Sequence, residues 1–267
     1  MASPNQQYDA IVTPYDYVRG STIALIERLD VCTILQPLIS GADVLELACG
    51  SGFYTYDLVA RGSRSVVAVD ISAHMLDKAQ EMGRSMGIKT GVTFIQSDCV
   101  IPDRYEGGPF DVVFGAWLLN YAPDHEGLIN MFRTVALNLK DGGTFVSVTL
   151  PPSSNPIESL NAEASARPEP DGSGYLNYKH IKNVDYGIFF GVHAETPFGK
   201  LYFECYHLTQ DIIEEAAMEA GLEGRVEWRK TNIPDSFFEK NPPGGATSRE
   251  METYLTVPAY GILIITK

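Results

Sequence analysis

The chain has few cysteines, and they lie far apart. Its four, Cys32, Cys49, Cys99 and Cys205, form no C-x-x-C motif. The sequence therefore has neither the disulfide framework of a small secreted domain nor the ligand spacing of a zinc site. We expect no metal centre, and we expect a cytoplasmic protein, because thiols stay reduced there.

Long apolar runs are also missing. No stretch approaches the roughly 18 apolar residues of a membrane-spanning helix. Residues 1–30 contain no basic segment followed by an apolar one, as a secretory signal would. We therefore expect neither export nor a membrane partner.

Positive charge is scarce. The 267-residue chain has 20 Lys and Arg against 34 Asp and Glu, a formal net charge of −14. No basic cluster is present that could neutralise phosphates, so a nucleic-acid partner is disfavoured. Hydrophobic residues make up 45% of the chain, which is enough for one large core with a modest insertion.

Short apolar runs alternate with longer helical patterns, which is typical of a mostly parallel sheet. Five runs are expected to be strands covered on both faces: Asp43–Leu47, Ser65–Asp70, Val92–Gln96, Asp111–Gly115 and Thr144–Leu150. Helices are expected between them, over residues 53–61, from a Ser72 cap to Met86, and from Pro123 to Lys140.

The segment VLELACGSGFYT, residues 44–55, places a tight glycine turn directly after the first of these strands. Gly50 and Gly52 would let the backbone approach a ligand closely, and free amides at the start of the next helix favour a carboxylate or phosphate. The turn lies where α/β sheets bind nucleotides. Because such a turn can also simply link a strand to a helix, its context decides.

Acidic residues at the ends of the next two strands favour a nucleotide site. Asp70 ends the second expected strand and Asp98 follows the third, at the same edge of the sheet as the glycines. One carboxylate could accept both hydroxyls of a ribose, and the other could accept the exocyclic amine of adenine. The pattern therefore indicates an adenosine derivative.

The glycine turn has the pattern E-x-x-x-G-x-G, because Glu46 stands four residues before Gly50. Thr55 occupies the position where a dinucleotide-binding motif has its third small residue. The turn resembles the first motif of class I S-adenosylmethionine-dependent methyltransferases. The resemblance extends over about residues 43–150. Four later segments resemble later blocks of that family in the same order: VVAVDIS, FIQSDCV, FDVVFGAWLLNYA and RTVALNLKDGGTFVSV.

This resemblance implies a doubly wound, Rossmann-like α/β fold. Its seven-stranded sheet would be mostly parallel with an antiparallel last strand, completed by a helix at 209–220 and strands at 225–230 and 260–265. The cofactor would be S-adenosylmethionine, with S-adenosylhomocysteine as product. The resemblance places Asp70 at the ribose and Asp98 with Cys99 at the adenine. The full expected set of cofactor-binding residues is Tyr15, Glu46, Ala48, Gly50, Gly52, Asp70, Ile71, Met75, Asp98, Cys99, Ala116 and Trp117.

Four regions are expected. They are an N-terminal helical lid (1–40), a cofactor-binding core (41–150), an acceptor-binding cap (151–208) and the rest of the core sheet (209–267) with a loop at 232–258. In the first region TPYD should begin a helix, with Thr13 as its cap and Asp16 closing a capping box. Its tyrosines could form a lid or fix the helix to the core. In the third region VDYGIFFG and KLYFECYH should form a hairpin over the acceptor.

A small-molecule acceptor is favoured, because Leu119-Asn120-Tyr121 lacks the prolines of the N/D-P-P-Y segment in nucleic-acid amino methyltransferases. The sulfonium already activates the methyl group, so positioning could supply most of the catalysis and a base would help only an acidic acceptor. The candidate bases, in order, are His193, Tyr121 and His125. The residues expected to contact the acceptor are Tyr8, Asn120, Tyr186, Phe189, Phe190 and Tyr202.

Three functions stay open at this point. The first is a small-molecule methyltransferase of specialised metabolism, a monomer or homodimer, acting on oxygen slightly ahead of nitrogen, carbon or sulfur. The second is an NAD(P)-dependent oxidoreductase on a Rossmann fold. The third is a methyltransferase-like protein that binds S-adenosylmethionine without transferring its methyl group. Binding of NAD(P) and not of S-adenosylmethionine would identify the second function. Transfer of a labelled methyl group from S-adenosylmethionine would separate the first from the third.

Overall fold

A seven-stranded sheet forms the core of the computed structural model, which describes residues 7–166, 176–243 and 247–267. Its strands lie in the order β3 (Val92–Gln96), β2 (Ser65–Asp70), β1 (Asp43–Leu47), β4 (Phe110–Ala116), β5 (Leu139–Thr149), β10 (Gly261–Thr266) and β9 (Arg225–Lys230). β10 runs antiparallel to both neighbours, whereas β1 to β5 pair in parallel. The predicted doubly wound α/β fold is confirmed.

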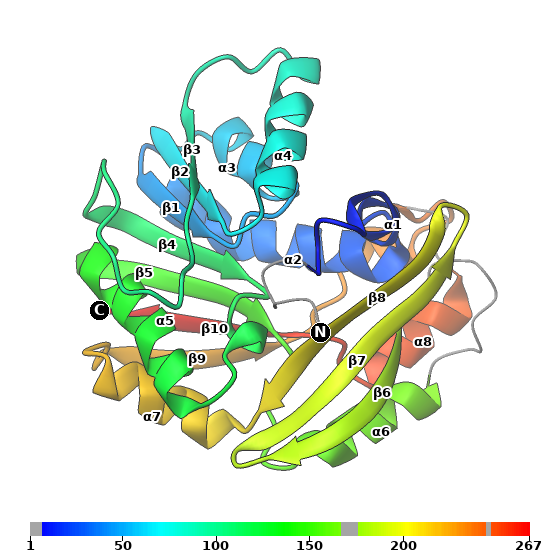
Figure 1. Ribbon diagram of the computed structural model, residues 1–267. Helices are drawn as coiled ribbons and strands as arrows, with labels where there is room; N and C mark the ends of the chain where they lie inside the picture. Colours follow the sequence, from blue (N-terminus) through cyan, green and yellow to red (C-terminus); the bar gives the residue numbers. More distant parts are fainter. Residues whose placement is uncertain (1–6, 167–175, 244–246) are drawn as a thin grey trace.

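Both faces of this main sheet are buried. Successive side chains of a strand point to opposite faces, so each strand contributes apolar residues to both. Leu47 and Val113 pack toward one face, which is covered by α5 (His125–Asn138) and α7 (Gln210–Glu219). Val44 and Phe114 pack toward the other. That face is covered by α2 (Thr22–Ile39), α3 (Thr55–Ala60), α4 (Ala73–Ser85) and α8 (Ser248–Thr256). The main sheet therefore lies between two layers of helices (Figure 1).

Local capping fixes where two of these helices begin. Ser72 Oγ accepts a hydrogen bond from the Met75 amide at 3.1 Å, which confirms the predicted cap of α4. The helix after β4 begins beyond Pro123, because the side chain of Asp124 caps it by accepting from the Gly127 amide at 2.8 Å.

The N-terminal helix begins differently from the prediction. α1 (Val12–Val18) has no side-chain cap, so the expected capping box with Thr13 is wrong. Asp16, which was expected to close that box, accepts a hydrogen bond from Ser51 Oγ at 2.6 Å instead. The carboxylate therefore joins α1 to the glycine turn rather than stabilising the start of its own helix.

A second sheet of three antiparallel strands, called here the cap sheet, follows β5. It consists of β6 (Asn177–Val184), β7 (Gly187–Thr196) and β8 (Gly199–Leu208). The predicted hairpin corresponds to β7 and β8. β6 escaped prediction because its residues are polar and mostly exposed, so no apolar alternation marks it. In Figure 1 the arrowheads of β4 and β5 point toward the cap sheet and α1.

Two further segments were not predicted as helices. α6 (Pro156–Ala166) packs against the cap sheet through Leu160. The expected loop at 232–258 contains a short 3-10 helix, η3 (Asp235–Phe238), and α8. Met251 and Tyr254 bury one side of α8 against the main sheet, and this periodicity is obscured by the preceding prolines and glycines. Residues 1–6, 167–175 and 244–246, which belong to the expected lid, cap and loop, lie outside the described residues.

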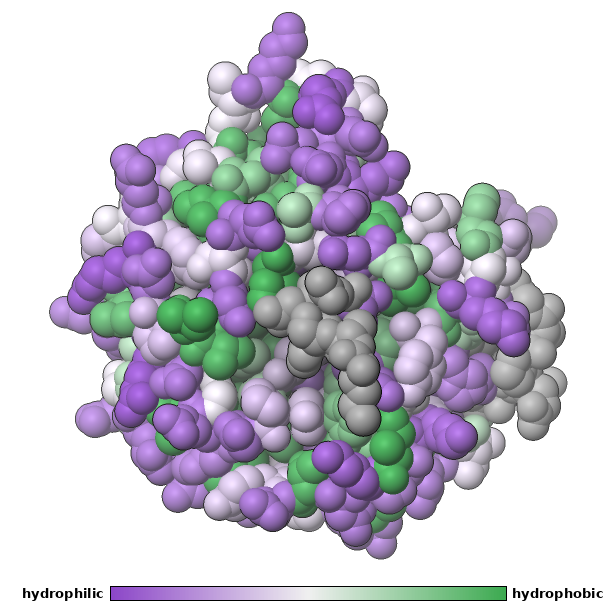
Figure 2. Space-filling view, viewed as in Figure 1, coloured by the Kyte–Doolittle hydropathy of each residue, from purple (hydrophilic) through white to green (hydrophobic). Residues whose placement is uncertain are grey.

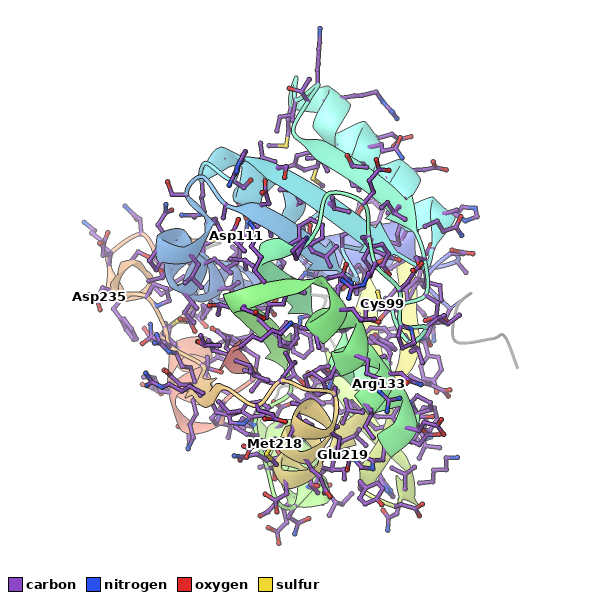
Figure 3. The ribbon with its side chains drawn as sticks, turned by 90° about the vertical axis from the view of Figure 1, so that its left-hand side faces the viewer. Cys99, Asp111, Arg133, Met218, Glu219 and Asp235 are labelled. Atoms are coloured by element: carbon purple, nitrogen blue, oxygen red, sulfur yellow. The ribbon has the colours of Figure 1, made fainter. Side chains whose placement is uncertain are left out.

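Polar side chains cover much of the face drawn in Figure 2, with apolar patches between them. Arg133 on α5 and Glu219 on α7 are exposed and project from the helical layer that Figure 3 shows. Within the three described ranges, no helix is both long enough and apolar enough to cross a membrane.

Candidate functional site

The glycine turn and Asp70 meet at the edge of the main sheet where the parallel strands end. The Gly50 amide donates to Asp70 Oδ2 at 2.8 Å, and the Ser72 amide donates to Asp70 Oδ1 at 2.9 Å. Asp70 thus joins the loop after β1 to the loop after β2. Burial raises the pKa of its carboxyl, although the backbone amides oppose that shift. We call the loops at residues 48–54, 70–72 and 97–100 the rim.

Left-handed backbone occurs at two positions directly after strands. Ala48 follows β1 with a φ of +56°, and Trp117 follows β4 with a φ of +62°. Ala116, the residue before Trp117, ends β4. Such backbone is uncommon for residues with a side chain and clusters at functional sites. Both positions turn the chain sharply at the same edge of the main sheet.

The two glycines of the turn serve different purposes. Both have left-handed backbone, with φ values of +54° for Gly50 and +89° for Gly52. A Cβ added at Gly50 would meet no atom within 4 Å, whereas one at Gly52 would lie 3.1 Å from Ala79 Cβ and 3.3 Å from the Tyr56 ring. Gly50 therefore leaves open space at the rim, and Gly52 lets α4 pack closely against the turn.

We expect Gly52→Ala to lower the free energy of unfolding more than Gly41→Ala. Each change places a side chain on left-handed backbone, at about 1–2 kcal/mol. Only the new Cβ at position 52 also presses on α4, because Gly41, with a φ of +72°, has no atom within 4 Å of its added Cβ. Urea unfolding of both variants tests this. Equal losses would contradict the close packing assigned to Gly52.

Glu46 lies buried beneath the glycine turn, with 2% of its surface exposed. Its Oε2 accepts a hydrogen bond from Thr55 Oγ1 at 2.6 Å. Burial raises the pKa of Glu46 to about 8, the bond from Thr55 opposes this shift, and the charge of Asp70 adds to it. At neutral pH and without a ligand, most of this carboxyl is therefore protonated.

The raised pKa of Glu46 predicts a pH dependence of stability. The unfolded chain releases this proton near pH 4.5, whereas the folded chain holds it to about pH 8. Glu46 therefore does not oppose folding below pH 4.5, and it destabilises the fold progressively as the pH rises to about 8. Glu46→Gln, which keeps an acceptor for Thr55, should remove this dependence. The difference between wild type and variant, measured by urea unfolding from pH 5 to 8.5, should grow with pH to a few kcal/mol, about 1.4 per unit of pKa. A constant difference would contradict the assignment.

The third part of the rim follows β3. Asp98 Oδ1 accepts from the Val100 amide at 3.0 Å, which orders the loop. Cys99, labelled in Figure 3, is buried, and burial raises the pKa of its thiol to about 12. On the neighbouring side, Ile71 is half-buried and Met75 is buried. The predicted cofactor residues after β2 and β3 therefore belong to one edge of the main sheet.

The segment that contains α1 is tied to two loops of the rim. Asp9 Oδ1 accepts from Ser72 Oγ at 2.5 Å and lies 3.4 Å from His74 Nδ1. On the other side, Asp16 accepts from Ser51. α1 also packs on β7 and β8, through a cluster of Ile11, Val18, Ala194 and Leu201. α1 thus connects the rim to the cap sheet.

A cavity that opens to solvent lies between the cap sheet, α1, α2 and the ends of β4 and β5. Four lining residues follow β4 and β5: Trp117, Asn120, Tyr121 and Leu150. The cap sheet contributes Tyr178, Phe190, Val192, Phe203 and Cys205. The N-terminal region contributes Tyr8, Tyr15, Val18, Arg19, Ala24 and Glu27. Most of the wall is therefore apolar and aromatic.

A buried ion pair interrupts this apolar wall. Arg19 Nη2 lies 2.9 Å from Glu27 Oε1, with side chains 12% and 4% exposed. The Tyr54 hydroxyl and Trp117 Nε1 donate to the same oxygen at 2.6 and 3.2 Å. The Arg19 guanidinium also lies 3.9 Å from the centre of the Phe53 ring. This network joins α2, the rim and the end of β4.

Several predicted acceptor-site residues do line the cavity. Asn120 Nδ2 donates to the Tyr206 carbonyl, and Asn120 Oδ1 accepts from Thr149 Oγ1, both at 3.1 Å, so its amide is fixed. The hydroxyls of Tyr8 and Tyr121 hydrogen-bond to each other. Phe190 lines the same cavity from β7.

Other predicted residues lie on the outer face of the cap sheet. Ile188, Phe190 and Val192 are buried on the inner face of β7, so alternation directs Phe189 and His193 outward. Neither is among the described residues that line the cavity. We therefore assign His193 no role as a base and Phe189 no contact with the acceptor.

Three more candidates lie away from the cavity. Tyr186 is 42% exposed in the turn between β6 and β7, where its ring contacts that of His125. Tyr202 is 50% exposed and donates to Glu204 Oε1 at 2.6 Å. None of the three is among the described lining residues. The sequence did not predict Arg19 and Glu27 as residues of this site. The one signal for Glu27 is that its charged side chain interrupts the apolar pattern of α2.

Metal ligands do not cluster in the part of the chain that the structure describes. No group of three or more His, Cys, Asp or Glu residues there is arranged to hold a metal ion. The four cysteines are buried as free thiols. The chemistry available at this site is therefore that of the rim and the cavity.

Comparison with known proteins agrees with this geometry. Residues 44–143 match a family model described as a methyltransferase domain. Phosphoethanolamine N-methyltransferase 1 of Triticum aestivum is 34% identical over 118 residues, 44% of this chain and 23% of that protein. The ubiquinone biosynthesis O-methyltransferase of Xylella fastidiosa is 30% identical over 121 residues, 45% and 46% of the two chains. This chain spans less than half the length of either relative.

Similarity to a solved structure extends over more of the chain. An S-adenosylmethionine dependent methyltransferase from Mesorhizobium loti aligns with a TM-score of 0.59 and 22% identity. The alignment covers 89% of this chain and 96% of that one. At this identity the alignment supports a shared fold.

Proposed function

Because residues 44–143 match a methyltransferase-domain model and the fold is shared with an S-adenosylmethionine dependent methyltransferase, we propose that the chain transfers the methyl group of S-adenosylmethionine to a small molecule bound in the cavity. One observation carries this proposal. The cavity wall begins directly after β4 and β5, at the edge of the main sheet that also holds the rim. Tyr15 and Trp117 belong both to that wall and to the predicted cofactor set. A cofactor on the rim would thus adjoin an acceptor in the cavity.

In this proposal the rim holds the cofactor. The carboxylate of Asp70 binds the ribose hydroxyls, Asp98 and Cys99 lie at the adenine, and the open space at Gly50 admits the ligand. Arg19 is the only cation among the described cavity-lining residues. Its guanidinium has donors beyond those used by Glu27, which suit the carboxylate of the methionine part.

The protein's part in the reaction is to position the acceptor and exclude water. S-adenosylmethionine supplies an activated methyl group when bound, so an in-line approach of the acceptor is the main requirement. α1 and the cap sheet enclose the cavity, while Asn120 and the Tyr8–Tyr121 hydroxyl pair offer polar contacts that could orient the acceptor. A role in specialised metabolism is part of the proposal, because an apolar, aromatic wall suits an organic acceptor.

Incubation of the purified chain with methyl-labelled S-adenosylmethionine and a metabolite extract tests the function. We expect label in a small organic product. Thermal stabilisation by NAD(P) and not by S-adenosylmethionine would instead identify an oxidoreductase. Binding of S-adenosylmethionine without label transfer would identify a protein that uses the fold for binding alone.

Gly50→Ala should weaken S-adenosylmethionine binding about tenfold or more, because the new Cβ enters the open space at the rim. Its effect on stability should equal that of Gly41→Ala, since neither Cβ meets a neighbouring atom. Calorimetric titration of both variants provides the measurement, with Gly41→Ala expected to bind as wild type does. Unchanged affinity of Gly50→Ala would remove this glycine from the cofactor site.

A further inference from the structure

We propose that the acceptor is an amine, and that the methyl group is transferred to its nitrogen rather than to oxygen. This inference rests on the proposed function. Its basis is an aromatic box in the cavity wall, formed by the rings of Tyr8, Tyr15, Tyr121 and Phe203. The four rings come from the N-terminal segment, the end of β4 and the cap sheet.

The rings of the aromatic box surround Tyr8. Its centroid lies 5.4 Å from that of Tyr15, 5.8 Å from that of Tyr121 and 5.5 Å from that of Phe203. The Tyr15 and Tyr121 rings are inclined to it by 87° and 73°. The Tyr15 and Tyr121 rings therefore pack edge to face with Tyr8, and all four rings have faces or edges in the cavity wall. Because those faces carry the negative part of the ring quadrupole, such a box favours a cation over a neutral group of the same size.

The charges in the wall also favour an amine over a phenol. Among the described lining residues there is no histidine or lysine, and the charge of Arg19 is matched by Glu27. An acidic acceptor would thus find no free base. Burial raises the pKa of Tyr121 and of Tyr15, so this environment disfavours a phenolate. A phenol bound beside them would experience the same penalty.

An amine needs no protein base for the transfer. The amine loses its proton to solvent before it enters the cavity, and the lone pair of the neutral form attacks the sulfonium methyl carbon. The C–N bond forms as the C–S bond breaks, and the electron pair of that bond remains on sulfur. The positive charge passes from sulfur to nitrogen, where the ring faces stabilise it. Any proton left on the product nitrogen goes to solvent after release. The Tyr8–Tyr121 hydroxyl pair can accept an N–H bond from the amine.

Binding of benzyltrimethylammonium, a mimic of the charged product, tests the aromatic box. The full chain loaded with S-adenosylhomocysteine is titrated with this cation and with neutral benzyl alcohol. Phe203→Leu, which keeps apolar volume but removes the ring, should weaken the cation about fivefold or more and benzyl alcohol less than about twofold. Phe238→Leu, at an exposed residue of η3, should change neither. Failure of the cation to bind, or equal effects of Phe203→Leu on both probes, would overturn the inference.

A matched pair of acceptors separates this inference from the proposed function. Label from S-adenosylmethionine should enter N-methylphenethylamine in preference to 4-ethylphenol. Preference for the phenol would overturn the amine assignment while leaving methyl transfer to a small molecule intact. Absence of S-adenosylmethionine binding would overturn both. If neither probe is labelled, the titrations with benzyltrimethylammonium decide.

Discussion

Asp70→Asn should weaken S-adenosylmethionine binding by about 1.5–3 kcal/mol, roughly 10- to 150-fold. Asp70 is 8% exposed and ends β2 at the rim. Its bonds to ribose hydroxyls would be charge-assisted, and such bonds are roughly twice as strong as neutral ones. An asparagine has one acceptor oxygen and no charge, so it would bind the ribose hydroxyls more weakly.

The same substitution also affects the free protein. Asp70 accepts from the amides of both Gly50 and Ser72, and an asparagine Nδ2 would face one of those donors. A stability loss of about 1–3 kcal/mol should therefore accompany the loss of affinity. Calorimetric titration well below both unfolding transitions separates the two effects.

Asp111→Asn provides the matched control for Asp70→Asn. Asp111 lies at the beginning of β4, on the side of the molecule that faces the viewer in Figure 3, and accepts from Lys140 Nζ at 2.8 Å. The Asp111→Asn substitution removes an equal charge at the opposite edge of the main sheet. S-adenosylmethionine affinity should therefore be unchanged. Equal affinities of wild type and Asp70→Asn would exclude Asp70 from the cofactor site.

The rim could be predicted because its chemistry lies in short, continuous segments. Each of its acids stands at or just after the end of an apolar strand, and parallel strands bring such ends to one edge. The link between Gly50 and Asp70 follows directly from that arrangement. The positions of Ala48 and Trp117 could be inferred, but their left-handed backbone could not, because neither residue type signals it.

The cavity was less predictable because its wall is assembled from segments far apart in the chain. Alternation along β7 places Phe190 on the buried face with Ile188 and Val192. Position 193 differs from 190 by an odd number, so the side chain lies on the opposite face. Arg19 and Glu27 belong to no motif, and only the folding of α1 against α2 brings them together.

Glu27→Ala should lower the free energy of unfolding by about 3–5 kcal/mol, because it leaves the buried charge of Arg19 without its partner. The Tyr54 hydroxyl and Trp117 Nε1 would lose their acceptor as well. This is the largest loss of stability that we expect from a single polar substitution here. Urea unfolding at neutral pH measures it.

The double variant Arg19→Met with Glu27→Leu distinguishes two causes of the stability loss in Glu27→Ala, the unpaired charge of Arg19 and the lost packing of the Glu27 side chain. It removes both charges and refills the space with apolar side chains, so it should recover most of the stability lost in Glu27→Ala. S-adenosylmethionine affinity should nevertheless fall by about 1.5–3 kcal/mol, because the guanidinium proposed to hold the methionine carboxylate is gone. A double variant as unstable as Glu27→Ala would show that packing, and not charge, accounts for the loss. A stable double variant that binds the cofactor as tightly as wild type does would confine Arg19 to a structural role.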